Sequence, residues 1–107
     1  MKWEKVNVYR VNRREDGKIM PLTETALDPS DLELLKKYMG AERIGTDALA
    51  YQDKDHYLFM YNSDEKRPYS SVLIWKFIPS PTHNTFVDMT REDAAAAELA
   101  AERYLKG

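Results

Sequence analysis

The stretch HYLFMYN at residues 56–62, followed by YSSVLIWKFI at residues 69–78, decides the fold of this chain. Both stretches are rich in aromatic and β-branched residues and follow the two-residue period of a β-strand. Their apolar residues occupy both faces: Tyr57, Phe59 and Tyr61 oppose Leu58 and Met60, while Val72, Ile74 and Ile78 oppose Leu73, Trp75 and Phe77. We therefore predict two strands that are buried on both sides.

A strand covered on one side alternates apolar with polar residues, so strands that are apolar on both faces need cover on both faces. Helices on both sides of the sheet would supply it, as would a sheet curled around one helix. Alternatively, one face is used for self-association or for a partner. We favour burial within the monomer. An exposed apolar patch above roughly a few hundred Å² would instead indicate an interface, and a small-molecule pocket is the least favoured alternative.

The chain before these stretches first predicts a β-hairpin. Residues 6–11 show a strand pattern, and Asp16-Gly17 is a hairpin turn signal because glycine accepts positive φ without steric cost. We expect residues 18–22 to return as a second strand. That strand should be short and lie at a sheet edge, since Pro21 lacks a ladder donor.

A helix follows, with clear signals at both ends. Asp28 or Ser30 is expected to cap its N-terminus, with Pro29 in the first turn and Glu33 at capping-box spacing from Ser30. Gly40 is expected to end it in the left-handed conformation. The expected apolar stripe consists of Leu32, Leu35 and Met39, widened by Leu34 and Tyr38.

The rest of the chain completes the sheet and adds a second helix. Residues 48–52 and 56–62, joined by a turn at Asp53-Lys54-Asp55, are expected to form a three-stranded meander with residues 69–78. Residues 85–89 are a candidate for a further short edge strand. An alanine-rich helix is expected from Arg91 to about Lys106, after Thr90 and with Asp93 at capping-box spacing. Its sheet-facing side should consist of Ala94, Ala97, Ala101, Tyr104 and Leu105.

These elements predict one α+β domain over residues 1–107, with the order β-β-α-β-β-β-α and two helices. Its antiparallel sheet consists of the hairpin and the three-stranded meander. The connections between neighbouring strands are of hairpin length, which precludes parallel crossovers between them.

Composition excludes several classes of function. The 16 basic and 18 acidic residues give a net charge of −2, which provides no strong attraction to nucleic acid or to an anionic membrane. The absence of cysteine excludes disulfides, thiolate metal sites and thiol catalysis, and it fits a reducing cytoplasm. No signal-peptide pattern opens the chain, and no apolar run approaches the roughly 20 residues needed to cross a bilayer. We expect a cytoplasmic protein that does not bind membranes.

Catalytic patterns are weak. Asp53, Asp55 and His56 are donors that suit a divalent cation, but aspartates are also typical of an ordinary hairpin turn. His83 and Asp88 have the residue types of a base and its orienting acid, yet a solvated loop histidine is the favoured interpretation. The four glycines form no phosphate-binding pattern. We predict no cofactor and no metal, and a small metal-dependent enzyme using His56 or His83 stays as the third hypothesis.

The working hypothesis is a small non-enzymatic interaction module: a regulator, inhibitor or accessory factor. It would bind another protein or itself, for example as a homodimer, through an aromatic sheet face. Aromatic residues dominate interface hot spots, and the predicted contact residues are Trp3, Tyr57, Phe59, Tyr61 and Trp75. The second hypothesis is a nucleic-acid-binding accessory protein with Arg10, Arg13 and Arg14 on phosphates. We place it second because acidic residues surround the aromatic strands.

Overall fold

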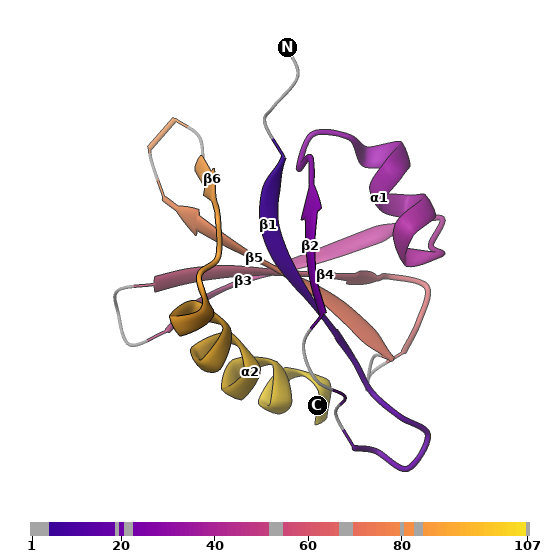
Figure 1. Cartoon of the computed structure of the whole chain (residues 1–107). Helices are drawn as coiled ribbons and strands as arrows, with labels where there is room; N and C mark the ends of the chain where they lie inside the picture. The colour runs from indigo at the N-terminus through magenta and orange to yellow at the C-terminus, as the bar shows by residue number, and fades with distance from the viewer. Residues whose placement is uncertain are drawn as a thin grey trace.

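The computed structural model describes residues 5–18, 20, 23–51, 55–66, 70–79, 81–82 and 85–106. Its sheet has the strand order β2-β1-β5-β4-β3, with β6 also paired to β5, and every described strand pair is antiparallel (Figure 1). This confirms the predicted α+β fold. The elements are β1 (Val6–Asn12), β2 (Thr23–Leu27), α1 (Leu32–Met39), β3 (Ile44–Tyr51), β4 (Asp55–Asn62), β5 (Ser71–Ile78), β6 (Thr85–Val87) and α2 (Arg91–Lys106).

The two stretches that decide the fold lie side by side as β4 and β5 in the interior of the sheet. In their register Leu58 lies opposite Trp75, and Phe59 lies opposite Ile74. β3 precedes them and pairs with β4 without interruption from residue 44 to residue 51. The three-stranded meander is confirmed. β3 begins at residue 44 rather than at 48, and the predicted turn residues 53 and 54 lie outside the described residues.

The first hairpin has the predicted turn, but its regular return strand lies further along the chain. Gly17 has a φ of 87°, and its N–H donates to the carbonyl of Arg14 at 2.9 Å. The regular partner of β1 is β2, in which Thr23 lies opposite Arg10 and Leu27 opposite Val6. The predicted return does begin at residue 18, because the N–H of Arg14 donates to the carbonyl of Lys18 at 2.7 Å and the N–H of Met20 to that of Asn12 at 2.8 Å. The regular strand β2, however, covers residues 23–27, where Leu27 is buried in the core. Residues 19, 21 and 22 lie outside the described residues.

α1 ends as predicted and begins later. Gly40 adopts the left-handed conformation, with a φ of 65°. The N-cap is Asp31, whose carboxylate accepts the N–H of Leu34 at 3.2 Å. Asp28, predicted as a cap, instead accepts the N–H and the hydroxyl of Ser30 within the preceding turn. A short carboxylate satisfies local backbone donors in a turn as readily as at a helix start, so the sequence did not separate the two roles.

α2 begins with the predicted capping box. The N–H of Thr90 donates to Asp93 Oδ2 at 2.9 Å, and the N–H of Asp93 donates back to Thr90 Oγ1 at 3.3 Å. The face with Ala97, Ala101 and Tyr104 is buried, as predicted. Small alanine side chains let the helix approach the sheet closely. Neither helix in the described residues is both long enough and apolar enough to cross a membrane.

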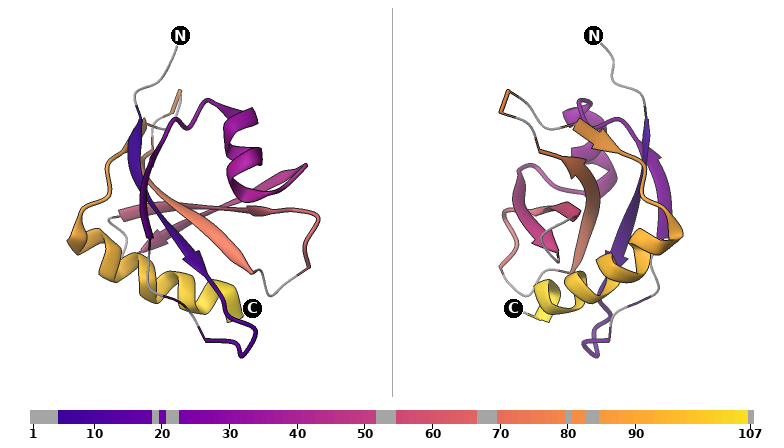
Figure 2. Two further views of the ribbon diagram at one scale, coloured as in Figure 1. Left: turned by 45° about the vertical axis from the view of Figure 1, so that its right-hand side comes forward. Right: turned by 90° about the vertical axis from the view of Figure 1, so that its left-hand side faces the viewer.

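Each face of the sheet is covered by one helix (Figures 1 and 2). On the α2 side the core consists of Tyr9, Val11, Tyr57, Phe59, Val72, Ile74, Met89, Ala97, Ala101 and Tyr104. On the α1 side it consists of Val8, Leu27, Leu35, Met60, Leu73 and Trp75. Burial within the monomer, by helices that flank the sheet, is therefore the arrangement that satisfies the two-sided strands.

The short helix α1 depends on Leu35, its buried residue. Leu35→Ala should lower the free energy of unfolding by about 2–5 kcal/mol, because it removes apolar contacts and leaves a cavity. The neighbouring Leu34 is 40% exposed, so Leu34→Ala is the matched control and should change stability by about 0.5 kcal/mol or less. Urea unfolding measures both. Equal losses would contradict the described orientation of α1.

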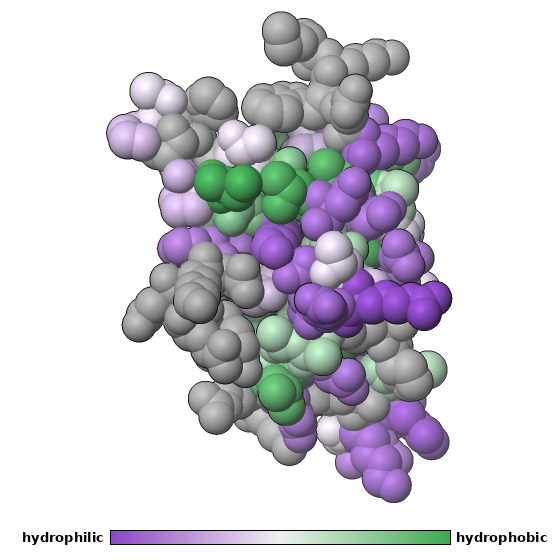
Figure 3. Space-filling view, turned by 60° about the vertical axis from the view of Figure 1, so that its left-hand side comes forward, coloured by the Kyte–Doolittle hydropathy of each residue, from purple (hydrophilic) through white to green (hydrophobic). Residues whose placement is uncertain are grey.

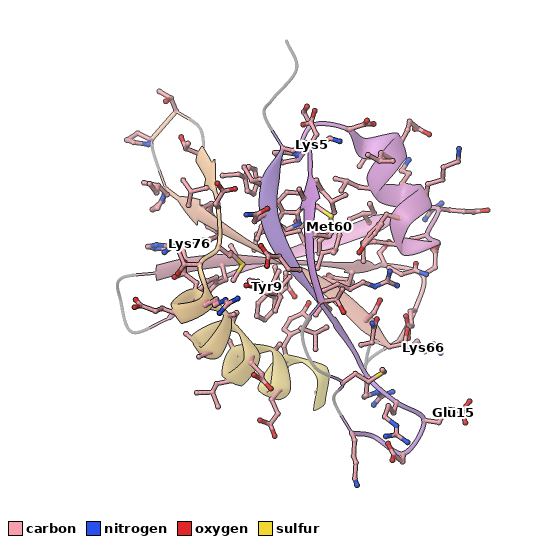
Figure 4. All side chains as sticks on the ribbon, viewed as in Figure 1. Lys5, Tyr9, Glu15, Met60, Lys66 and Lys76 are labelled. Carbon is pink, nitrogen blue, oxygen red and sulfur yellow. The ribbon has the colours of Figure 1, made fainter. Side chains whose placement is uncertain are left out.

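A partly buried ion pair joins α2 to the central strand. Lys76 Nζ lies 2.7 Å from Asp93 Oδ1, and Figure 4 shows Lys76 beside the start of α2. Asp93 is only 8% exposed. Burial by itself would raise the pKa of this carboxyl, but the hydrogen bonds from Lys76 and Thr90 outweigh it and lower the pKa below its usual value. The ionised form of Asp93 is therefore favoured by folding.

This shift gives stability a defined pH dependence. A carboxyl whose pKa is lower in the folded state contributes its full stability above the unfolded pKa of about 3.9, and the contribution is lost as pH falls through the folded pKa. Asp93→Asn should cost about 1–3 kcal/mol near pH 7. It should also flatten the acid loss of stability between about pH 5 and pH 2 in urea unfolding.

The matched control for this prediction is Asp16→Asn. Asp16 lies 3.9 Å from Arg14 in an exposed pair, and exposed pairs contribute little to stability. The control should therefore retain the wild-type acid profile. An Asp93→Asn profile parallel to that of the wild type would refute the assigned role of Asp93.

Candidate functional site

The aromatic residues predicted as a contact surface are mostly core residues. Tyr57, Phe59 and Trp75 each have 0% exposure. The first two lie under α2, and Trp75 lies on the α1 side. These three side chains offer no surface to a partner in the folded monomer, because the two helices already cover both sheet faces. Tyr61 is half-buried and keeps exposed surface, while Trp3 lies outside the described residues.

The three arginines of the nucleic-acid hypothesis do not form one basic surface. Side chains alternate along a strand, so positions 10 and 13 belong to opposite faces. The guanidinium of Arg10 lies 5.0 Å from the ring centre of Tyr38 on α1, and its Nε donates to Asn12 Oδ1 at 3.2 Å. Arg14 lies at the turn beside Asp16. The strand therefore does not place the three charges along a single phosphate path.

Of the residues considered for catalysis, the structure describes the side chains of His56 and Asp88, which lie in separate local contacts. His83 and Asp53 lie outside the described residues, as does the side chain of Asp55. The ring of His56 lies 5.6 Å from that of Phe77. Asp88 Oδ1 accepts the N–H of Asn7 at 2.7 Å, which ties β1 to the segment after β6. Within the described residues, no three His, Asp or Glu side chains are grouped to hold a metal ion.

Apolar side chains do not gather into one broad patch on the described surface. Figure 3 shows a face on which green apolar surface falls into two areas separated by a belt of purple polar side chains. The exposed large apolar residues lie on α1, on β5, on α2 and in the segment before β2: Leu32 and Leu34, Ile78, Leu99 and Met20. A shallow hollow on the outside of α1 is lined by Asp31, Glu33, Leu34, Lys36, Lys37, Gly40, Ala41 and Glu42. Its charges of both signs do not select a class of ligand.

The most distinctive surface of the described structure is the outer edge of β3. This strand is last in the sheet order and runs for eight residues in unbroken register with β4. Natural sheets usually protect such edges with lysine, proline, a bulge or a short strand. β3 reads IGTDALAY, and its sole charged residue is Asp47. The opposite edge strand, β2, has five residues and carries the exposed Glu24.

The register shows which backbone groups of β3 face outward. The N–H of Ser63 donates to the carbonyl of Arg43 at 3.0 Å, so residue 43 occupies a hydrogen-bonded position of the ladder. Such positions alternate with non-hydrogen-bonded ones in an antiparallel pair. Odd positions of β3 therefore bond to β4. The even positions 44, 46, 48 and 50 direct their N–H and C=O groups away from the sheet.

A group of four residues, which we call the edge cluster, supports β3 on the α2 side: Gly45, Asp47, Tyr61 and Tyr104. The hydroxyl of Tyr104 donates to Asp47 Oδ2 at 2.7 Å and links α2 to the edge strand. The ring of Tyr61 occupies the space above Gly45, where a Cβ would lie 2.5 Å from ring atoms. A larger residue at position 45 would therefore force the Tyr61 ring to move. Within the edge cluster, Asp47, the one charged residue of β3, is therefore hydrogen-bonded to α2 through Tyr104.

Sequence reasoning missed this site for two reasons. The first half of β3 contains Gly45 and Asp47, which are poor strand formers. The β-branched residues Ile44 and Thr46, two positions apart, were the local signal that could have extended the strand. The position of β3 at the sheet edge is a consequence of strand order, which local patterns do not specify.

No family model, no curated protein and no solved structure matches this chain. The function must therefore be inferred from the described surface.

The hydrogen bond within the edge cluster can be measured by a double-mutant cycle. We expect Asp47→Ala and Tyr104→Phe to be coupled by about 1–3 kcal/mol in urea unfolding, because the acceptor is a carboxylate. As a control, Asp47→Ala combined with Tyr38→Phe should be additive within about 0.5 kcal/mol, since Tyr38 packs on the α1 side. Additivity of the first pair would show that the bond adds nothing to stability.

Proposed function

We propose that this chain is a small cytoplasmic protein-interaction module, acting as a regulator, inhibitor or accessory factor. It binds another polypeptide by adding a strand to the outer edge of β3. The observation that supports this most strongly is the unbroken eight-residue edge, whose even positions direct their N–H and C=O groups away from β4. In strand addition, main-chain hydrogen bonds provide affinity and alternate side chains provide specificity.

The surroundings of the edge favour this mode of binding. Thr46 and Ala48 are exposed and uncharged, so a partner strand can approach without burying a charged group. Behind the edge, Tyr57 and Phe59 of β4 lie opposite positions 49 and 47 and are fully buried. A template already held by the core loses little conformational freedom on binding. In this view the buried aromatic residues support the site, and Tyr61 can contact the partner.

The nucleic-acid hypothesis has weaker support. Phosphate binding depends on grouped basic residues, and β3 contains none. Arg10 is engaged with Tyr38 and Asn12. A backbone edge recognises an extended polypeptide rather than a phosphate chain.

Proline at an outward position tests the proposal. Ala48→Pro removes an outward N–H while leaving the β3–β4 ladder its donors, as edge strands tolerate. Random ten-residue peptides displayed on phage are selected against dilute wild-type protein, and the selected peptides are measured by fluorescence anisotropy. We expect Ala48→Pro to weaken their binding by at least about tenfold.

Ala48→Thr is the matched control, because it changes the same side chain and keeps the N–H in a residue that favours strands. It should retain binding within about threefold. Circular dichroism and thermal unfolding check that both variants are folded. The proposal is overturned if selected peptides bind Ala48→Pro as well as wild type, or if neither peptides nor wild-type protein itself show any Ala48→Pro-sensitive association.

A further inference from the structure

We infer that the strand added to β3 is β3 of a second copy of this chain, paired antiparallel about a two-fold axis that passes between the two Ala48 residues. This inference rests on the proposed function and names its partner. It follows from three features of β3: the parity of its outward groups, the place of its one charge, and its length.

The parity of the backbone restricts the registers that are open to a symmetric pair. In a hydrogen-bonded pair of an antiparallel ladder, each residue offers its N–H and C=O to the other. Outward residues of one copy must therefore face outward residues of the other, and in β3 these are the even positions. Within residues 44–51, the symmetric registers that pair five residues or more are centred on position 46, 47, 48 or 49.

The charge of β3 removes the register centred on residue 47. There, Asp47 of each copy would lie directly opposite Asp47 of the other, in a non-hydrogen-bonded pair whose side chains are close. Like charges in that position destabilise a sheet. Each carboxylate is also held on its own α2 side by Tyr104, so the two charges would share one face of the joined sheet.

Length decides among the three remaining registers. Centring on residue 46 pairs residues 44–48 with themselves, and centring on residue 49 pairs residues 47–51, while centring on residue 48 pairs residues 45–51. The register centred on residue 48 has the longest ladder and places Asp47 opposite the neutral position 49. It joins Thr46 to Ala50 of the other copy, and Ala48 to Ala48, through roughly six backbone hydrogen bonds.

Two further features suit a second copy. A two-fold interface uses the same surface on both partners, so the surface must be self-complementary, and this register meets that condition without an opposing charge. The net charge of −2 per chain also provides little long-range repulsion between copies at physiological salt. The result is a continuous sheet of two monomers joined at their β3 edges.

Cysteine cross-linking tests the register directly, because the chain has no cysteine of its own. Hydrogen-bonded residues face each other with Cα atoms about 5.5 Å apart, within the roughly 4.4–6.8 Å that a disulfide accepts. Under mild oxidation at micromolar concentration, Ala48→Cys should form a covalent dimer and Thr46→Cys alone should not. A mixture of Thr46→Cys with Ala50→Cys should cross-link, whereas a mixture of Thr46→Cys with Ala48→Cys should give no mixed dimer.

Analytical ultracentrifugation of the full chain supplies the second readout. Wild type should sediment as a dimer at concentrations where Ala48→Pro is a monomer, and Ala48→Thr should follow wild type. A Thr46→Cys dimer, a mixed Thr46→Cys and Ala48→Cys dimer, or a dimer insensitive to Ala48→Pro would overturn the inference.

The two proposals can fail separately. A wild-type monomer at every concentration, with peptides whose binding is lost in Ala48→Pro, overturns self-pairing and leaves strand addition supported. A wild-type monomer without such peptides overturns both.

Discussion

The structure depends on one constraint, which is that the central strand β5 must be dry on both sides. Ile74 and Trp75 are neighbours in the chain, point to opposite faces and are both fully buried. Burying such residues is the dominant favourable contribution to folding. The two helices must therefore lie on opposite faces. Figure 4 shows the result, with Tyr9 directed toward α2 and Met60 toward α1.

Given this constraint, the two helices are attached in different ways. α1 is short and depends on Leu35, with Tyr38 and Met39 packed beside it. α2 is longer and lies close to the sheet because its buried face is largely alanine. Polar contacts near its two ends also hold α2 to the sheet: Lys76 with Asp93, and Asp47 with Tyr104. The polar contacts fix where α2 lies along the strands, which small apolar side chains alone do not specify.

The parts of the fold that were predictable are those governed by local chemistry. The Thr90 capping box, the left-handed Gly40 and the turn at Gly17 each follow from what one or two side chains permit the backbone to do. The start of α1 was not predictable in the same way, because two nearby aspartates can each accept backbone hydrogen bonds and local sequence does not say which of them caps the helix. Asp28 and Asp31 are both capable caps, and the structure uses one for a turn and the other for the helix.

The candidate site could not be predicted from the sequence, because residue types that suggest an interface also favour the core. Aromatic residues on two-sided strands suggest an interface, but the same apolarity drives them into the core. Tyr57, Phe59 and Trp75 became the interior of the molecule. The edge of β3, in contrast, is a property of the backbone and of strand order. Thr46 and Ala48 carry no compositional signal of binding, so side-chain types alone could not reveal them.

The pairing of β5 with both β1 and β6 also has a consequence for how the protein folds during synthesis. One edge of β5 is shared, with β1 on residues 71–74 and β6 on residues 76–78, and the N–H of Met89 donates to the carbonyl of Asn7. β1 is therefore completed by a segment that follows it far along the chain. Until α2 has left the ribosome, the face that it covers stays open to water and to other nascent chains. A chain truncated before residue 91 would lack α2 and leave Tyr9, Tyr57 and Phe59 without the helix that covers them.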